Sequence, residues 1–361
     1  MPEGINVDLI NNGSGQGELA TYLMEHGRMD SNAMRPYVYQ GKTYISVYKG
    51  SGDRKDVKNY KAIQVNSTGT LRPLEWRQLD EAILPLAESR LVGINHLISK
   101  GLVYNLGNAM GTTVLESHNI SDALEAELTM DAISKGKNDQ VEYGVTYLPI
   151  PIIHADYSLN LRQLNASRNL GNPIDTTMAE RAVRKVSEKL EKMLFTSVNY
   201  KFGGGSIYSY TNYPDRNQVS IGTHWDHSGV TGKQIVQQVQ SMVEAAKEAH
   251  FFGPFTLYIP MKYGTIVDND YSDAKGDITI RERILKITSI KEVVDVDTLA
   301  DDNVLLVQMT RDVVRLVQGM GITNVQWKSE GDFIQNFKVL TIQVPQIRSD
   351  QDGHCGIVHL A

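Results

Sequence analysis

The sequence predicts an α+β fold. Residues 177–197 place apolar side chains at helical spacing over about 20 positions, which indicates one long amphipathic helix. Residues 141–147 and 155–161 instead alternate apolar and polar side chains, as half-buried strands do. Of the 361 residues, 41% are hydrophobic and 22% are charged, so the chain can bury a core like other folded globular proteins.

The composition also limits the classes of function. No apolar run reaches the roughly 18 to 20 residues that cross a bilayer, and residues 1–10 lack a basic flank followed by an apolar stretch. We therefore expect a chain without a membrane partner, in the cytoplasm or in a particle assembled there. Cys355 is the single cysteine, which excludes an intrachain disulfide and a cysteine-rich zinc site. The net charge of −6 argues against a main surface for phosphate, so any contact with DNA should be local and weak.

Residues 1–71 are predicted to form an N-terminal arm with little core of its own. They are rich in Gly, Asn and Ser, and their periodic stretches are as short as residues 44–48. Fixing one residue costs roughly 1 to 2 kcal/mol of backbone entropy, so an arm with few apolar anchors needs another surface to order it. We expect neighbouring subunits to supply that surface, with residues 44–48 adding to an exposed sheet edge there.

A basic cluster in the arm is the best local candidate for contact with nucleic acid. Asp53 and Asp56 dilute its charge, and a solvated loop is the simpler interpretation. The members of the cluster are Lys49, Arg54, Lys55, Lys58 and Lys61.

A helix and a long loop follow the arm. The helix starts near Pro73, which suits a first helical turn, and Pro85 inside it predicts a kink or two abutting helices. Residues 109–147 are then predicted to form two strands, at 112–118 and 141–147, with a polar tip between them. A connection of this length without core residues at its end is usually functional or disordered, so we expect it to project away from the body.

The clearest helix of the chain begins with a capping box of Thr177 and Glu180 and runs to about Ser197. On its polar face, Glu180 with Arg184 and Glu188 with Lys192 are spaced four apart, and each pair adds only about 0.2 to 0.5 kcal/mol. Its apolar stripe therefore fixes its position. The stripe consists of Ala182, Val183, Val186, Leu190, Met193 and Leu194.

In the second half of the chain, the sequence pattern predicts another helix and several strands. The helix begins with a capping box of Thr231 and Gln234. The continuous apolar run at 255–259 indicates a buried strand, because strands covered on both faces lack alternation. A further helix is expected at 280–287, and further strands at 293–296, 304–309, 312–317, 335–344 and 357–360.

Four segments carry a family resemblance that covers residue 72 to the end. RPLEWRQLDEAILPLAESRLVGINHLISKGL, at 72–102, looks like an opening helix, and YSLNLRQLNASRNLGNPIDTTMAERAVRKVSEKLEKMLF, at 157–195, looks like a strand and a long spine helix. GPFTLYIP, at 253–260, is similar to a central strand, and RDVVRLVQGMGITNVQWKSEGDFIQNFKVLTIQVPQ, at 311–346, to closing strands. In this order they resemble encapsulins and the related major capsid proteins of tailed bacteriophages.

The resemblance implies the Hong-Kong-type tailed-phage capsid fold, with an arm, an extended loop, a peripheral domain and an axial domain. The expected division is an N-terminal arm at 1–71, the first part of the peripheral domain at 72–108, the extended loop at 109–147, the peripheral domain with the spine helix at 148–229, the axial domain at 230–330, and closing strands of the peripheral domain at 331–361.

The resemblance also implies a function. The chain would be a major capsid protein, not an enzyme, that assembles as pentamers and hexamers into an icosahedral shell around a phage DNA genome. It would reside in the virion after assembly in the host cytoplasm, with scaffolding, decoration and portal proteins as further partners. No catalytic residue, cofactor or metal ligand is predicted. The alternative is an encapsulin nanocompartment around a cargo enzyme, although an arm of about 70 residues before Arg72 favours a virus.

Weaker signals point to other chemistry. Gly13, Gly15 and Gly17 between a short strand pattern and a helix pattern loosely suggest a nucleotide-binding enzyme, but their spacing departs from the dinucleotide-binding fingerprint. His224, Asp226 and His227 are of types that bind metals, yet a polar surface turn explains them as well.

Lys135 and Lys137 at the loop tip invite comparison with relatives of this fold that cross-link a loop lysine to an asparagine of the neighbouring subunit. Because no partner set is recognisable, a noncovalent shell is expected.

Overall fold

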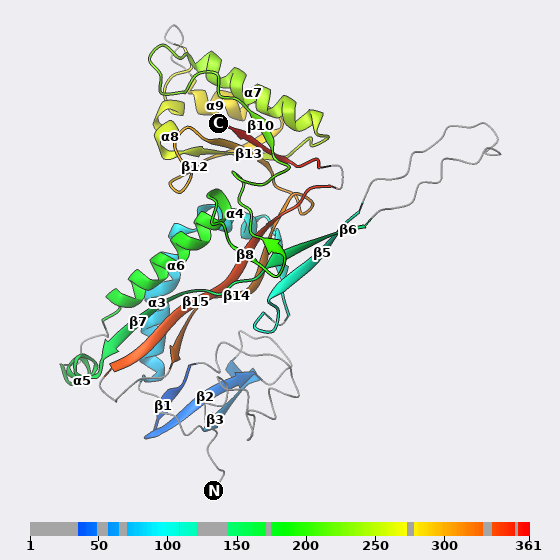
Figure 1. Cartoon of the computed structure of the whole chain (residues 1–361). Helices are drawn as coiled ribbons and strands as arrows, with labels where there is room; N and C mark the ends of the chain where they lie inside the picture. The colour runs from blue at the N-terminus through cyan, green and yellow to red at the C-terminus, as the bar shows by residue number, and fades with distance from the viewer. Residues whose placement is uncertain are drawn as a thin grey trace, which may run out of the picture.

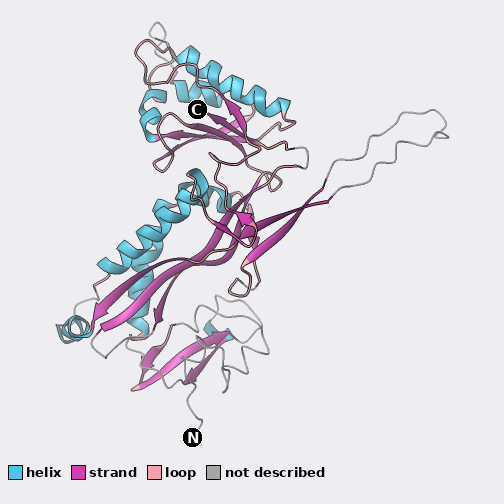
Figure 2. Ribbon diagram, in the orientation of Figure 1, coloured by secondary structure: helices cyan, strands magenta, loops and turns pink. Residues whose placement is uncertain are grey.

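The computed structural model describes residues 35–48, 57–64, 71–107, 109–120, 143–170, 175–272, 278–327, 334–350 and 353–361. Figures 1 and 2 show a small sheet near the N-terminus, a long twisted sheet beside a long helix, and a further sheet covered by helices at the opposite end. Among the described residues, no helix is both long and apolar enough to cross a membrane.

The small sheet is formed by the described part of the predicted arm. It contains β1 (Tyr37–Tyr39), β2 (Lys42–Tyr48) and β3 (Tyr60–Gln64), in the order β1-β2-β3, with a 3-10 turn at Val57–Asn59. Strand β2 pairs with β1 through Lys42–Tyr44 and with β3 through Tyr44–Tyr48. Residues 44–48 therefore belong to a sheet of their own chain, and their addition to a sheet of a neighbouring subunit stays a prediction. The small sheet buries the apolar side chains of Ile45, Val47 and Ile63. This small core was not expected from the polar composition of the arm.

The small sheet is fastened to helix α3 (Pro73–Arg90). The guanidinium of Arg35 lies 4.6 Å from the ring centre of Trp76 and forms an ion pair with Asp80. The indole Nε1 of Trp76 donates a hydrogen bond to the Pro36 carbonyl oxygen at 3.1 Å. One aromatic side chain of α3 thus joins the arm to the body. Pro85 lies inside α3, and the break before α4 (Val92–Ser99) falls at Leu91, beyond the position where a kink was expected.

The peripheral sheet has the strand order β4-β14-β15-β7, formed by β4 (Val103–Asn105), β14 (Val314–Trp327), β15 (Ile334–Ile347) and β7 (Ile153–Asn160). Strand β7 buries Tyr157 and Leu159 and exposes the polar residues between them, as its alternation predicted. It leads through α5 (Leu161–Leu170) to the spine helix α6 (Thr177–Phe195). Figure 1 shows α6 lying along the peripheral sheet.

Helix α6 buries the whole apolar stripe predicted from the sequence. The N-cap, however, is Thr176 and not Thr177, and the Thr176 hydroxyl donates a hydrogen bond to Glu180 at 2.6 Å. Because Thr176 and Thr177 are adjacent, the sequence pattern could not show which of the two is the N-cap. The charged pairs also differ, because Glu188 binds Arg184 and Lys185, each at 2.9 Å.

The axial sheet has the order β10-β16-β13-β11-β12 and lies at the opposite end from the small sheet (Figure 1). Its strands are β10 (Asn217–Val219), β16 (Ile357–Leu360), β13 (Val304–Gln308), β11 (Phe255–Pro260) and β12 (Ile290–Val296). Helices α7 (Gly232–Glu248), α8 (Met261–Val267) and α9 (Ile280–Leu285) cover one face of it. The predicted capping box of α7 is present, since the Thr231 amide donates to Gln234 Oε1 at 2.8 Å.

The chain passes between the two large sheets repeatedly. Strand β14 lies in the peripheral sheet although residues 314–327 were expected in the axial domain. Strand β16 lies in the axial sheet although residues 357–360 were expected to close the peripheral domain, and β10 precedes the expected start of the axial domain. Pairings between strands far apart in sequence leave no periodic signal, so the pattern could not assign a strand to its sheet.

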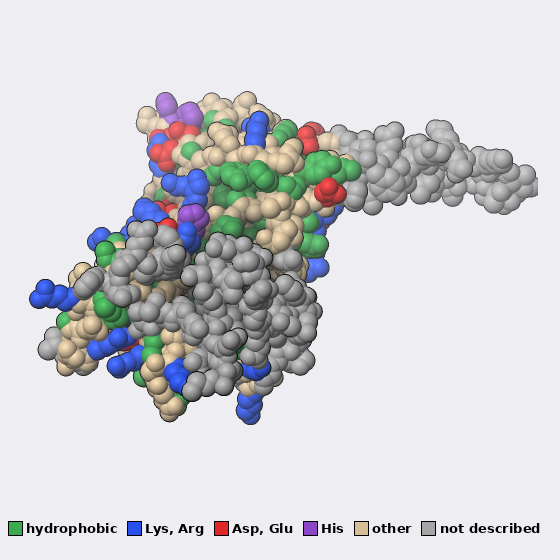
Figure 3. All heavy atoms as spheres, turned by 60° about the horizontal axis from the view of Figure 1, so that its bottom comes forward, with side chains coloured by type: hydrophobic (Ala, Val, Ile, Leu, Met, Phe, Trp, Pro, Cys, Tyr) green, Lys and Arg blue, Asp and Glu red, His purple; other side chains and the backbone are tan. Residues whose placement is uncertain are grey.

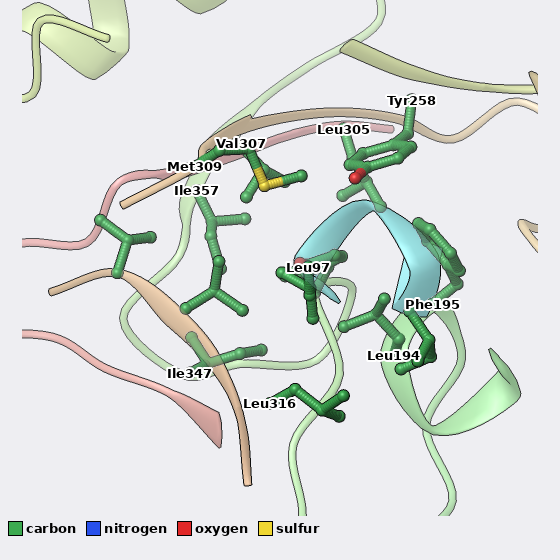
Figure 4. Close-up of a cluster of buried hydrophobic side chains, with 14 of the residues drawn as sticks. Leu97, Leu194, Phe195, Tyr258, Leu305, Val307, Met309, Leu316, Ile347 and Ile357 are labelled. Carbon is green, nitrogen blue, oxygen red and sulfur yellow. The ribbon is translucent and has the colours of Figure 1, made fainter. Parts of the chain in front are cut away.

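Alternate residues of the axial sheet serve two cores. Leu257, Ile259 and Leu306 pack under α7, α8 and α9. Tyr258, Leu305 and Val307 face the other way and pack with Leu97 of α4 and the end of α6 (Figure 4). The axial sheet is therefore covered on both faces, and its lower core is shared with the peripheral region.

Candidate functional site

The first feature with a potential functional role is an antiparallel ribbon. Its strands β5 (Val114–Ile120) and β6 (Tyr143–Pro149) pair from Val114 opposite Pro149 to Ile120 opposite Tyr143. This confirms the two strands predicted for the extended loop, each shifted by about two residues. Figure 1 shows the ribbon directed away from both large sheets. The loop tip with Lys135 and Lys137 lies outside the described residues.

The base of the ribbon is held firmly. The Ser117 hydroxyl lies 2.6 Å from the Thr146 hydroxyl and accepts a hydrogen bond from the Gln346 side-chain amide at 3.0 Å. The hairpin of β8 (Lys201–Phe202) and β9 (Gly205–Ser206) packs against β6. A Cβ atom at Gly205 would lie 2.1 Å from the Tyr147 carbonyl oxygen, so only glycine permits this approach. The direction of the ribbon is thus set by the body.

The ribbon and the hairpin expose apolar side chains. Val145 is 45% exposed, Tyr147 43% and Phe202 52%, whereas Leu148 at the ribbon base is buried. Figure 3 shows hydrophobic side chains gathered on one part of the described surface. Contiguous exposed apolar surface of this kind is typical of a protein-protein contact.

The second feature is a carboxylate buried at the junction of the two large sheets. Glu191 on α6 is 1% exposed and accepts hydrogen bonds from the amides of Gly93, at 2.6 Å, and Ile94, at 3.4 Å. These amides are unpaired within α4 because they belong to its first turn. Burial raises the pKa of Glu191 to about 7, against the opposing effect of the two hydrogen bonds. Sequence pattern missed this residue, since a glutamate beside an apolar stripe is normally solvated.

Aromatic rings surround the buried carboxylate. The rings of Phe195 and Tyr258 meet edge to face at 5.1 Å, and Tyr210 stacks on Tyr258 at 6.2 Å. Burial raises the pKa of both tyrosine hydroxyls, so they stay neutral. A Cβ at Gly93 would lie 2.6 Å from the Phe195 ring, which explains the glycine in the first turn of α4. Close packing here holds the spine helix against the axial sheet.

The third feature is a charged end of the axial domain. Lys262 Nζ lies 2.8 Å from Asp226 Oδ2 and 3.6 Å from Asp302 Oδ1. The Tyr263 hydroxyl donates a hydrogen bond to Asp302 at 2.6 Å, and His224 Nδ1 lies 3.6 Å from the same carboxylate. Figure 3 shows acidic and histidine side chains together at this end of the molecule.

The structure separates the residues considered as metal ligands. Asp226 binds Lys262, whereas His227 Nδ1 lies 2.9 Å from the Ser228 carbonyl oxygen and His224 faces Asp302. Within the described ranges, no group of three or more His, Cys, Asp or Glu side chains is arranged to hold a metal ion. The three side chains thus contact three different partners in this turn.

Other candidates from the sequence fall partly outside the structure. Gly13, Gly15 and Gly17 are not among the described residues, nor are Lys49, Arg54 and Lys55 of the basic cluster. Its remaining members, Lys58 and Lys61, are exposed.

Comparison with solved structures shows the fold. The chain resembles the virus-like particle of Pyrococcus furiosus with a TM-score of 0.58 and 17% identity, covering 79% of this chain and 99% of that one. It resembles the capsid of Myoviridae phage XM1 with a TM-score of 0.56 and 11% identity, covering 73% and 90%. The predicted capsid fold is confirmed.

Comparison of sequences agrees with this fold. The chain is 22% identical over 274 residues to a diheme-cytochrome-encapsulin shell fusion protein of Kuenenia stuttgartiensis, a match that covers 75% of this chain and 69% of that protein. A family model described as a family of unknown function, DUF6260, matches residues 66–360. The chain therefore belongs to the DUF6260 family.

Proposed function

We propose that this chain is a major capsid protein whose copies assemble into an icosahedral shell around a phage DNA genome. The ribbon of β5 and β6 carries the proposal. It is fixed at its base through Ser117 and Gly205 and presents Val145 and Tyr147 to solvent. A two-stranded ribbon is at best marginally stable in water, so contact with a neighbouring copy would stabilise it.

The capsid fold supports repeated self-association. Heterologous contacts between copies, in which different surfaces meet, generate closed rings when the rotation closes. In the proposed shell these rings are pentamers and hexamers. The net charge of −6 favours a shell that contacts its DNA weakly. Scaffolding, decoration and portal proteins would be further partners in the virion, with assembly in the host cytoplasm.

A role without catalysis is part of the proposal. The solved neighbours are described as a virus-like particle and a phage capsid, and the relative is described as a shell fusion protein. The polar clusters of the described residues are engaged in structural contacts, such as Glu191 with α4 and Asp226 with Lys262. These structural contacts account for the polar clusters without a bound substrate.

An encapsulin nanocompartment is the second candidate. The likeness to an encapsulin shell fusion protein and to the virus-like particle of Pyrococcus furiosus favours it. The two candidates share a shell and differ in the contents.

Electron microscopy of the purified full chain tests the shell, and analysis of its contents separates the candidates. Under the main proposal, particles purified from phage-producing cells carry tails and contain nuclease-protected DNA. Tailless particles with a co-purified cargo enzyme and no DNA would favour the nanocompartment. A chain that stays monomeric at high concentration, with or without other virion proteins, would contradict both.

A further inference from the structure

The axial domain contains a basic groove between α7 and the segment that leads from α9 into β12. The groove has a volume of about 520 Å³. Lys247, Arg283 and Lys286 line it together with Thr288 and Ser289. Within the described part of the chain, none of these cations forms an ion pair. Lys247 and Lys286 lie at helix C-termini, where the helix dipole favours cations, but that effect does not explain why both face one groove with Arg283.

The groove also has an apolar side chain at its edge. Phe252 is 68% exposed and lines the same cavity as Lys247 and Lys286. A large exposed aromatic ring next to cations is a common anchor in protein interfaces, where aromatic residues contribute a disproportionate share of the binding energy. The groove therefore suits an acidic protein surface with an apolar side chain beside it.

A surface of this kind lies at the other end of the same domain. Asp226 and Asp302 both contact Lys262, and Asp301 forms no ion pair within the described residues, so the carboxylates outnumber the ammonium group. Met261, next to Lys262, is 60% exposed. We call Asp226, Asp301 and Asp302 with Met261 the acidic knob.

Strand direction places the groove and the knob at opposite ends. Strands β11 and β12 are parallel, with Phe255 opposite Ile290 at one end and Pro260 opposite Val296 at the other. Phe252 and Ser289 precede the first end, whereas Met261 and Asp301 follow the second. Six residues of strand span roughly 20 Å, so one copy cannot fill its own groove with its own knob. In Figure 1, α8 lies at the side of the axial domain where β11 ends.

We propose that the basic groove receives the acidic knob of a second copy of this chain. The contact is heterologous, because two different surfaces meet, and repeating it around an axis generates a ring. Opposite charges would set the orientation of adjacent copies, and Phe252 would pack against the neighbour's knob. This inference rests on the proposed shell function and names the surfaces that join axial domains within it.

Charge reversal on each surface tests the contact in the full-length chain. Lys286→Glu places a carboxylate opposite the knob, and Asp301→Lys places an ammonium opposite the groove. Each change replaces attraction by repulsion, so each should raise the concentration needed for shell formation about tenfold or more. The double variant restores complementarity and should assemble nearly as well as the unaltered chain. Lys192→Glu, at an exposed position of the spine helix α6 outside both surfaces, is the matched control and should assemble normally.

Light scattering and electron microscopy measure assembly, and thermal unfolding of the unassembled chain shows whether each variant folds. If the single variants melt like the unaltered chain and form normal shells, the groove contact is wrong while the shell function stands. If Lys286→Glu impairs assembly but the double variant restores nothing, the knob is not the occupant and the inference is overturned. If the unaltered chain forms no shell, the proposed function itself fails.

Discussion

The carboxylate of Glu191 accepts a hydrogen bond from the backbone amide of Gly93 at 2.6 Å, joining the spine helix to the first turn of α4. This contact lies where the peripheral and axial regions share a core, and burial raises the pKa of Glu191 to about 7. A buried group that titrates near neutrality makes stability depend on pH.

Glu191→Gln should remove a defined part of that pH dependence. The folded chain keeps the proton on Glu191 up to about pH 7, whereas the unfolded chain releases it near the ordinary value of 4.5. Between these values the folded state binds more protons, so stability falls as the pH rises and levels off above pH 7. The glutamine variant should show a flatter profile in chemical unfolding from pH 4.5 to 7.5. A profile parallel to that of the unaltered chain would contradict the assignment.

Leu190→Ala should destabilise the chain by about 2 to 5 kcal/mol, because it leaves a cavity at a fully buried position of α6. Lys189→Ala on the exposed side of the same helix is the control and should change the free energy of unfolding by less than about 0.5 kcal/mol. Denaturant unfolding measures both. Equal losses would mean that the faces of α6 are wrongly assigned.

Trp76→Phe should loosen the small N-terminal sheet. It removes the hydrogen bond to the Pro36 carbonyl, which leaves a buried acceptor unpaired, and should cost about 1 to 3 kcal/mol. Leu74→Ala, on the same helix but 70% exposed, should cost little. Limited proteolysis should cut residues 35–64 faster in the Trp76 variant alone.

Tyr147→Ser should impair assembly more than it lowers the stability of the isolated chain, because the residue is 43% exposed on the ribbon. The neighbouring buried residue gives the contrast, since Leu148→Ala should lower the melting temperature directly. Normal shells from the Tyr147 variant would show that this face of the ribbon stays uncovered.

Shells should dissociate into one species when boiled in detergent and reductant. Cys355 is buried, and burial raises its pKa to about 12, so it is a poor candidate for a link between subunits. Electrophoresis should give a single band near 40.3 kDa. A ladder of larger species would reveal a covalent link, with Lys135 and Lys137 as the first residues to replace.

The helices were predictable because their signals are local. The stripe of α6 and the capping box of α7 depend on residues within a few turns of each other. The small N-terminal sheet escaped prediction because its core depends on Ile45, Val47 and Ile63, which are scattered among polar residues. Assigning β14 and β16 to their sheets required partners far away in the sequence, β4 for β14 and β13 for β16.

The same limit applied to the candidate site. Val145 and Tyr147 could be placed on one face of a strand by their alternation, and the structure confirms the strand. Glu191 gave no signal, because its partners are backbone amides about a hundred positions earlier. The groove and the acidic knob became recognisable only when the parallel pairing of β11 and β12 fixed their positions.

The repeated passage of the chain between the peripheral and axial sheets has a mechanical consequence. The segments from α6 to β10, from β13 to β14 and from β15 to β16 each connect the two regions. A pulling force on the axial end is therefore shared by these three connecting segments and is not carried by one of them alone. Cutting one of these connections with a protease leaves the others in place, so a nicked subunit should still carry load through the rest.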